Sequence, residues 1–149
     1  MDDAVNLCAL LRRQGRLKEA AALYSIWLPR FPDELQFHLN ASNCLHELQE
    51  NEACVRLLRG YLQRHPDAHS IQQKLARSLG ELQHLEEAQA ILLSLTHAYP
   101  SEVEYLMELG LCYHRLEKRN EALKCFEKAS CLNPEHLLAI SNRITILKD

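Results

Sequence analysis

Four of the five prolines in this 149-residue chain are separated by a constant interval of 34 residues. They are Pro32, Pro66, Pro100 and Pro134. A fixed period of about 20 to 50 residues is typical of repeat proteins, in which each structural unit packs mainly against its neighbours. The periodicity therefore predicts a repeat architecture for the whole chain and disfavours a single core built from unrelated elements.

The segment 103–136 carries the clearest copy of the repeat. Its apolar and small residues are Leu106, Leu109, Gly110 and Tyr113 in the first half, and Ala122, Phe126 and Ala129 in the second. Apolar residues three and four positions apart predict a buried face on each of two helices. With Pro134 at its end, the segment resembles the tetratricopeptide repeat (TPR), a helix–turn–helix unit of about 34 residues.

The resemblance covers the whole chain and implies its fold. We expect an all-α protein, a TPR-type α-solenoid in which antiparallel helix pairs form a right-handed superhelix. The expected single domain, 1–149, contains four repeats and a C-terminal capping helix, at 1–34, 35–68, 69–102, 103–136 and 137–149. One helix pair cannot bury a core alone, so stability is expected to come from stacking between neighbouring repeats.

Small residues are expected where the helices cross, and larger residues between them. The small positions are Cys8, Ser42, Ala76 and Gly110 at one crossing, and Ala20, Cys54, Ala88 and Ala122 at the other. The larger positions are Tyr24, Leu58, Leu92 and Phe126. One departure from the family pattern lies three residues further on, where Ala129 conforms and Trp27, Tyr61 and Leu95 do not.

Local signals predict where helices begin and end. Gln14-Gly15-Arg16 is an expected turn, and Pro29 should end or kink its helix because proline removes a backbone hydrogen bond. Two pairs have the spacing of capping boxes: Asp33 with Gln36, and Ser101 with Glu104. The faces expected to be buried in the first and last helices are Leu7, Cys8 and Leu11, and Ile140, Ile144 and Leu147.

Charge and composition exclude several classes of partner. The formal net charge is −3 and the basic residues are scattered, so the footprint of a nucleic-acid-binding protein is missing. No apolar run is long enough for a membrane span, and the N-terminus has no signal-peptide pattern. We therefore expect a cytoplasmic protein whose six cysteines are thiols, since disulfides are rare in a reducing compartment.

Residues for catalysis or metal binding are not indicated. The nearest histidine pair, His65 and His69, lies on either side of Pro66, and the cysteines lack C-x2-C spacing. Cys8, Cys44, Cys54, Cys112 and Cys125 fall at packing positions, whereas Cys131 is expected to be more exposed. Phosphate-binding loops and nucleophile elbows are also missing. We expect a protein that is not an enzyme and uses no metal or cofactor.

The TPR resemblance also indicates where a partner would bind. In such proteins the first helix of each repeat lines a concave groove that holds an extended peptide or a helix. The residues expected to contact the partner are Asn6, Arg12, Arg13, Asn40, Asn43, Lys74, Arg77, Glu108 and Asn142.

Two known TPR binding patterns can be compared with these positions. The sixth residue of successive repeats reads Asn6, Asn40, Lys74, Glu108 and Asn142, a partial asparagine ladder or a set of ordinary solvated residues. An asparagine amide can donate to and accept from a peptide backbone. The carboxylate clamp of chaperone-binding TPR domains is absent, because its places hold Val5, Ala9, Asn40, Ser70 and Lys74.

The leading hypothesis is a protein–protein interaction scaffold that binds a peptide or helix in its groove. One alternative is a TPR recruiting or regulatory module of a larger protein, such as a bacterial transferase. Another is an assembly scaffold that associates with itself, although we expect a monomer. The partner is expected to be a protein or peptide, with no nucleic acid and no membrane.

Overall fold

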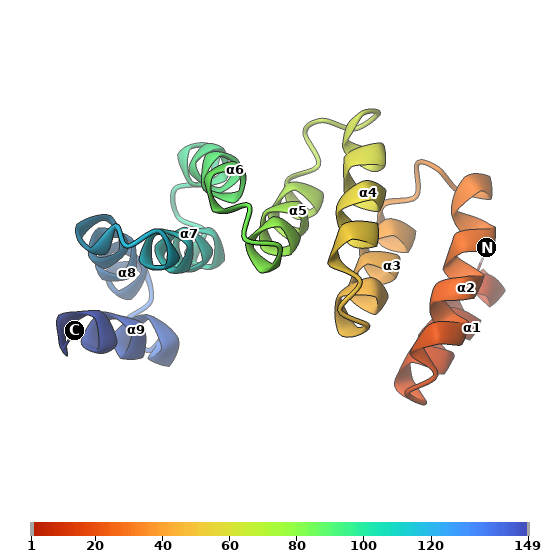
Figure 1. The fold of residues 1–149 in the computed structure, drawn as a ribbon, viewed down its shortest axis with the longest axis horizontal. Coiled ribbons are helices and arrows are strands. Elements are labelled where there is room, and N and C mark those ends of the chain that lie inside the picture. Colours follow the sequence, from red (N-terminus) through yellow and green to blue (C-terminus); the bar gives the residue numbers. More distant parts are fainter. Residues whose placement is uncertain (1, 149) are drawn as a thin grey trace. The chain divides into compact units, whose positions relative to one another are not determined.

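The computed structural model describes residues 2–148, with side-chain detail for residues 6–146. These residues form nine α-helices and one short 3₁₀ helix, without a strand (Figure 1). In chain order the elements are α1 (Asp2–Arg13), α2 (Leu17–Trp27), η1 (Leu28–Arg30), α3 (Leu35–Glu47), α4 (Asn51–Leu62), α5 (His69–Glu81), α6 (Leu85–Ala98), α7 (Val103–Arg115), α8 (Arg119–Leu132) and α9 (Leu137–Lys148). The predicted all-α architecture of helix pairs is confirmed.

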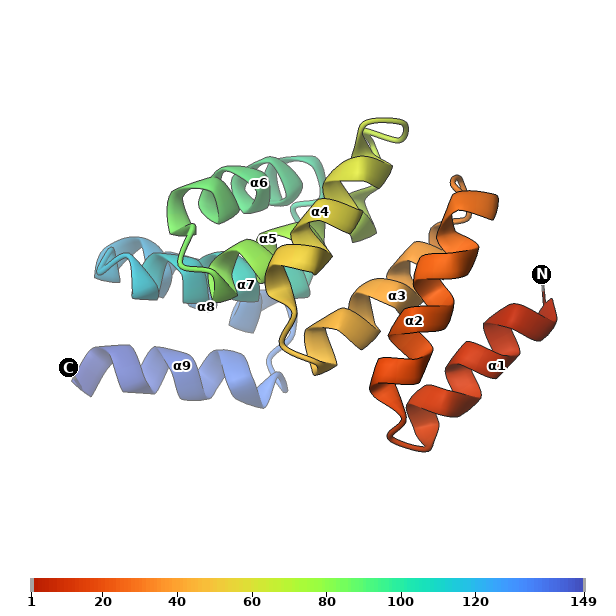
Figure 2. The same ribbon diagram turned by 45° about the vertical axis from the view of Figure 1, so that its right-hand side comes forward.

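The chain divides into two compact units within the helix α5. The N-terminal unit comprises Met1–Ser78 and the C-terminal unit Leu79–Asp149. In the N-terminal unit α1 with α2, and α3 with α4, form hairpins, and in the C-terminal unit α7 packs with both α6 and α8 (Figures 1 and 2). The expectation that one domain spans 1–149 stays a prediction.

The core of the N-terminal unit lies between α1, α2 and α3. Its fully or nearly buried members are Cys8, Leu11, Ala20, Tyr24, Phe37, Ala41 and Cys44. The rings of Tyr24 and Phe37 meet edge to face, with centroids 5.1 Å apart, a favoured aromatic geometry. Burial raises the pKa of Tyr24 to about 12, so its hydroxyl is neutral at physiological pH.

The core of the C-terminal unit centres on Phe126. Leu106, Met107, Ala122, Phe126, Ala129, Ala139 and Ile146 are buried together there. Gly110 lies so close to this ring that a β-carbon at that position would stand 2.5 Å from Phe126 Cε1. All twelve small and large packing positions predicted from the repeat are buried, which confirms their register.

Each helix hairpin turns through one residue with positive φ, and these residues recur every 34 positions. They are Gly15 (74°), Gln49 (61°), Gln83 (63°) and Glu117 (58°). Glycine adopts this left-handed conformation without steric cost, whereas other L-residues are strained there. The predicted Gln14-Gly15-Arg16 turn is confirmed, and its backbone is repeated at three positions where no glycine signals it.

Pro29 has the predicted effect on its helix. The helix α2 ends at Trp27, and Leu28–Arg30 continue as the 3₁₀ helix η1 with the proline in its first turn. A proline is tolerated there because the first N–H groups of a helix have no partner within it.

Both predicted capping boxes are wrong. The N-cap residues of α3 and α7 are Glu34 and Glu102, and neither makes a side-chain capping hydrogen bond. The Asp33 carboxylate instead accepts hydrogen bonds from Arg64 and His65. Longer-range partners therefore compete successfully for a side chain that could have capped the helix.

The predicted inward faces of the two end helices are partly wrong. Cys8 and Leu11 are buried, but Leu7 is 47% exposed. In α9, Ile140 is partly buried and Ile144 is 44% exposed, while Ala139 and Ile146 are the buried residues; the side chain of Leu147 lies outside the described residues. A spacing of i, i+4 and i+7 identifies an apolar stripe, but packing against one neighbour decides which part of the stripe is covered.

Two buried thiols make equivalent contacts in the two units. Cys44 Sγ donates to the carbonyl oxygen of Leu17 at 3.3 Å, and Cys112 Sγ donates to that of Leu85 at 3.3 Å. Leu17 and Leu85 are the first residues of α2 and α6, each the second helix of its repeat. The prediction of five buried cysteines and an exposed Cys131 is confirmed, and all six are free thiols.

Candidate functional site

A small pocket in the N-terminal unit brings together three of the nine residues predicted to contact a partner. Asn43 from α3 and Lys74 and Arg77 from α5 line it. The remaining lining residues are Ser42, His46, Cys54 and Ser78. The cavity measures about 20 Å³, which is room for roughly one water-sized group.

The floor of the pocket is neutral and fixed by hydrogen bonds. Ser78 Oγ donates to Cys54 Sγ at 3.3 Å, and Cys54 Sγ lies 3.7 Å from the carbonyl oxygen of Ser42, to which it donates. All three residues are buried. Burial is the main cause that raises the pKa of the Cys54 thiol, so the floor carries no negative charge at neutral pH.

The wall of the pocket carries two cationic side chains and a histidine. Lys74 Nζ donates to Asn43 Oδ1 at 2.5 Å, which joins α5 to α3 across the cavity. Arg77 is exposed one helical turn further along α5, and His46 lies one turn after Asn43 on α3. A lysine, an arginine and a histidine therefore converge at a site whose lining residues include no carboxylate.

Four other predicted residues of this unit lie outside the pocket. Arg12 Nε lies 3.5 Å from Glu47 Oε1, an ion pair between α1 and α3. Asn40 Oδ1 accepts a hydrogen bond of 3.1 Å from Gln36 Nε2 on the same helix. Asn6 and Arg13 are exposed on α1. One of the predicted contact residues, Arg12, is thus already paired with a carboxylate of the protein itself.

The last two predicted residues belong to the C-terminal unit. Asn142 on α9 lines a cavity of about 30 Å³ with Leu111, His114, Phe126, Thr145 and Ile146. Glu108 is partly buried on α7 and does not line this cavity. The sequence positions of the asparagine ladder are therefore divided between the two units, and peptide binding by them stays a prediction.

Sequence reasoning interpreted the floor of the N-terminal pocket as packing alone. Ser42 and Cys54 occupy the small positions of two crossing helices, and Ser78 was not singled out. The available signal was their polarity, because a serine and a cysteine stand where the equivalent positions of 69–102 hold Ala76 and Ala88. Buried polar groups usually satisfy one another by hydrogen bonding, as these do.

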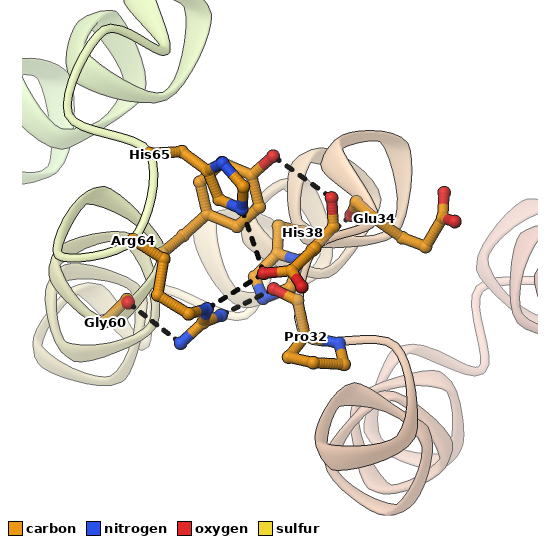
Figure 3. A network of polar contacts seen from close by, with 8 residues as sticks. Pro32, Glu34, His38, Gly60, Arg64 and His65 are labelled. Carbon is orange, nitrogen blue, oxygen red and sulfur yellow. Dashed lines mark hydrogen bonds and ion pairs between the residues drawn. The ribbon is translucent and has the colours of Figure 1, made fainter.

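A second polar cluster joins the loop before α3 to the end of α4 (Figure 3). The carboxylate of Asp33 accepts hydrogen bonds from Arg64 Nε at 3.1 Å and from His65 Nε2 at 2.9 Å. Arg64 also donates to the carbonyl oxygens of Pro32 and Gly60. The hydrogen bonds from His65 and Arg64 are the main causes that lower the pKa of Asp33.

An aromatic stack lies beside this cluster. The Tyr61 ring has its centroid 4.5 Å from that of His38 and 4.6 Å from that of His65. His38 is buried, and its Nδ1 donates to the carbonyl oxygen of Glu34 at 2.9 Å. Burial is the largest cause that lowers the pKa of His38. The neutral imidazole is therefore the form that the folded unit favours.

In the described part of the chain, no group of three or more histidine, cysteine or acidic side chains is placed to hold a metal ion. Among its helices, none is long and apolar enough to cross a membrane.

Comparisons with known proteins agree with the helix-pair fold. Two family profiles, both of the tetratricopeptide repeat, match residues 9–69 and 103–136. A search of curated proteins gives no match.

Several solved structures are similar to this chain at low sequence identity. A crystal structure of MamA has a TM-score of 0.84 at 14% identity, covering 95% of this chain and 82% of that one. The structure of MamA 41-end from Desulfovibrio magneticus RS-1 has a TM-score of 0.81 at 17% identity, and the match covers 99% of this chain and 89% of that one. The structure of Pseudomonas aeruginosa pilF has a TM-score of 0.82 at 20% identity, and the match covers 99% of this chain and 67% of that one. These likenesses concern the fold, and together with the two profile matches they show that this chain belongs to the tetratricopeptide repeat family.

Proposed function

We propose that this protein is a non-enzymatic scaffold that binds a segment of a partner protein on the α3–α5 face of its N-terminal unit. The observation that carries the proposal is the pocket in which Asn43, Lys74 and Arg77 converge. These residues were predicted from repeat position alone, and they come from the first helices of two different repeats. A segment lying across both helices could contact all three residues at once.

The small size of the pocket limits how much of the binding free energy it can contribute. A hydrogen bond to a charged group contributes roughly 1.5–3 kcal/mol, and a micromolar complex requires about 8 kcal/mol. The pocket therefore supplies an anchor, and the rest of the affinity has to come from contacts along the surrounding helices. This fits a peptide or helix better than a small molecule, for which a cavity of about 20 Å³ is too small.

Affinity capture with the full chain as bait tests the proposal. Partners recovered by the wild type should be reduced at least ten-fold with Asn43→Ala/Arg77→Ala. Lys124→Ala/Lys128→Ala, which removes two exposed cations from α8, should recover them as the wild type does. Thermal unfolding of each bait shows whether the fold is retained.

Equal recovery by both double variants would move the binding surface away from the pocket. Recovery of untagged copies of the same chain and of no other protein would favour the self-associating scaffold. One observation supports that second candidate, because Leu137 and Leu138 on α9 are 79% and 66% exposed. The cytoplasmic location and the exclusion of nucleic acid and membranes as partners stay predictions.

A further inference from the structure

The outward face of α9 is exposed and carries no charged residue. Within residues 137–146 of this helix the exposed residues are Leu137, Leu138, Ser141, Ile144 and Thr145. Leu137, Leu138 and Ile144 are 79%, 66% and 44% exposed. We propose that a second copy of this chain covers this stripe, with α9 of one protomer packed antiparallel against α9 of its partner. The proposal rests on the second candidate function, self-association, and does not depend on the α3–α5 pocket.

The inward face of α9 is apolar as well. The helix packs against α8 (Figure 2), and Ala139 and Ile146 are buried in the core of the C-terminal unit. Among residues 137–146 only Arg143 is charged. The exposed side of α8, by contrast, carries Arg119, Glu121, Lys124, Glu127 and Lys128. A helix that is apolar on both faces is typically buried on both, so α9 has the composition of a helix between two layers.

The spacing of the exposed residues suits an antiparallel pair of identical helices. Leu137 and Leu138 lie four and three residues before Ser141, and Ile144 and Thr145 lie three and four residues after it. Reversing the helix exchanges the two sets and leaves Ser141 in place, so the stripe matches a copy of itself. A two-fold axis beside Ser141 would place Leu138 against the partner's Ile144, and Leu137 against the partner's Thr145. Such a self-complementary contact closes with two copies.

The polar members of the stripe and the helix ends are compatible with this arrangement. Thr145 Oγ1 donates to the carbonyl oxygen of Ser141 at 3.1 Å, so its hydroxyl already has an acceptor and its methyl group can contact Leu137. A small residue at the axis lets two helices approach to about 8–10 Å. Antiparallel packing also brings the partial positive charge at each helix N-terminus to the partial negative charge at the other C-terminus. A parallel pair would bring like ends together.

The available area determines how strong the dimer can be. A helix of 12 residues is about 18 Å long, so two such helices bury less than the roughly 1,200–2,000 Å² of a stable specific interface. The chain has a net charge of −3, and two copies therefore repel each other. We expect reversible association at roughly 10–500 μM, strengthened by salt because salt screens this repulsion.

Sedimentation equilibrium of the full chain over roughly this concentration range tests the proposal. Leu138→Glu and Ile144→Lys should each weaken association about ten-fold or more, because each places a charge against an apolar side chain. An equimolar mixture of the two variants should recover association, since the introduced carboxylate then lies opposite the introduced ammonium. Ile26→Glu, at a 58% exposed position of α2, is the matched control and should associate as the wild type does.

Disulfide cross-linking tests the two-fold axis directly. Cys131→Ser removes the exposed thiol, and Ser141→Cys in that background should give a cross-linked dimer on mild oxidation, because residue 141 meets its own copy at the axis. Ser25→Cys in the same background, at an exposed position of α2, should remain monomeric on a denaturing gel.

Three outcomes would overturn the proposal. The first is a wild-type chain that stays monomeric throughout the range. The second is a dimer that Leu138→Glu does not weaken and that Ser141→Cys does not cross-link, which would place its interface elsewhere. The third is a monomer that captures a different protein and loses it in Leu138→Glu, which would assign the stripe to that partner. The capture experiment with Asn43→Ala/Arg77→Ala decides separately whether the α3–α5 site binds a partner.

Discussion

The two units place different chemistry in the pockets beside their first helices. In the N-terminal unit the pocket between α3 and α5 is lined by serine, asparagine, histidine, lysine and arginine side chains, with a thiol at its floor. In the C-terminal unit the pocket beside α7 and α9 is lined by Leu111, Phe126 and Ile146 as well as polar residues. The same repeat therefore builds an ionic site in one unit and a largely apolar one in the other.

The loops that join one repeat to the next differ in the same way. In the N-terminal unit the loop before α3 is bound to the end of α4 through Asp33, Arg64 and His65 (Figure 3). In the C-terminal unit the loop before α7 is flanked by an aromatic pair, Tyr99 and Tyr105, whose centroids are 6.0 Å apart. Charged contacts respond to salt and pH, whereas an aromatic contact responds little, so the units should differ in these responses.

The packing of the helix crossings also differs between the units. Gly110 faces the large ring of Phe126, while the equivalent positions of the N-terminal unit hold Ser42 and Leu58. The first repeat holds Cys8 and Tyr24 at the same two positions. The residue pair therefore changes from repeat to repeat, and Gly110 is the position at which the structure shows no room for a β-carbon beside the large ring.

The largest expected effect comes from filling the space between Gly110 and Phe126. Gly110→Ala should destabilise the C-terminal unit by about 1–3 kcal/mol, because the new methyl group would overlap the Phe126 ring. In a Phe126→Leu background the additional cost of Gly110→Ala should be smaller, since the shorter side chain leaves room. Denaturant unfolding measures the change in stability for each variant, and hydrogen exchange shows in which unit the change occurs.

Gly60→Ala is the matched control for Gly110→Ala. Gly60 also lies inside a helix, but a β-carbon there would meet no atom within 4 Å. Alanine is favoured over glycine in a helix interior, so this change should stabilise the N-terminal unit by about 0.5–1 kcal/mol. Equal effects of the two substitutions would contradict the close packing of Gly110 against Phe126.

A smaller effect is expected from the charged loop contact. Arg64→Ala removes hydrogen bonds to Asp33, Pro32 and Gly60, and should cost the N-terminal unit about 1 kcal/mol because the site is partly solvated. Arg56→Ala, at an exposed position of α4, should cost less. High salt should reduce the difference between the variants, and a difference independent of salt would indicate that packing is responsible.

The smallest effect concerns pH. Because the pKa of His38 is lowered in the folded unit, its contribution to stability is complete above its ordinary value of 6.5 and decreases as the pH falls through the folded value. Asp33 has the same sign at lower pH, since its pKa is lowered from 3.8. The protection factors of buried amides in α3 and α4, which compare each exchange rate with that of an unfolded peptide at the same pH, should therefore decrease as the pH falls from 7.5 to 5.5. In His38→Gln this decrease should be smaller.

The repeat period allowed much of the fold to be predicted from sequence. The spacing of Pro32, Pro66, Pro100 and Pro134 indicated the helix pairs and the buried register, because every repeat has to bury the same face against its neighbours. The capping boxes were predicted wrongly, since Asp33 has a longer-range partner in Arg64. Local spacing carries no information about a residue 31 positions away.

The candidate site was predictable in part. Repeat position selected Asn43, Lys74 and Arg77 as residues on first helices, and the structure brings them into one pocket. In the structure, Asn142 lines a different pocket in the C-terminal unit, and Arg12 forms an ion pair with Glu47. A sequence position specifies the face of a helix, but the partner of a charged side chain depends on which helices become neighbours.

By itself the sequence determined the helix pairs, the turn at Gly15, and the small and large packing positions. Those features depend on periodicity and local residue type, which are properties of the chain. Only the tertiary structure decided that Ser78 and Cys54 form a neutral floor, that Lys74 is held by Asn43, and that Asp33 binds Arg64 and His65. These contacts join residues at least 24 positions apart, and such pairs become neighbours only after the helices have packed.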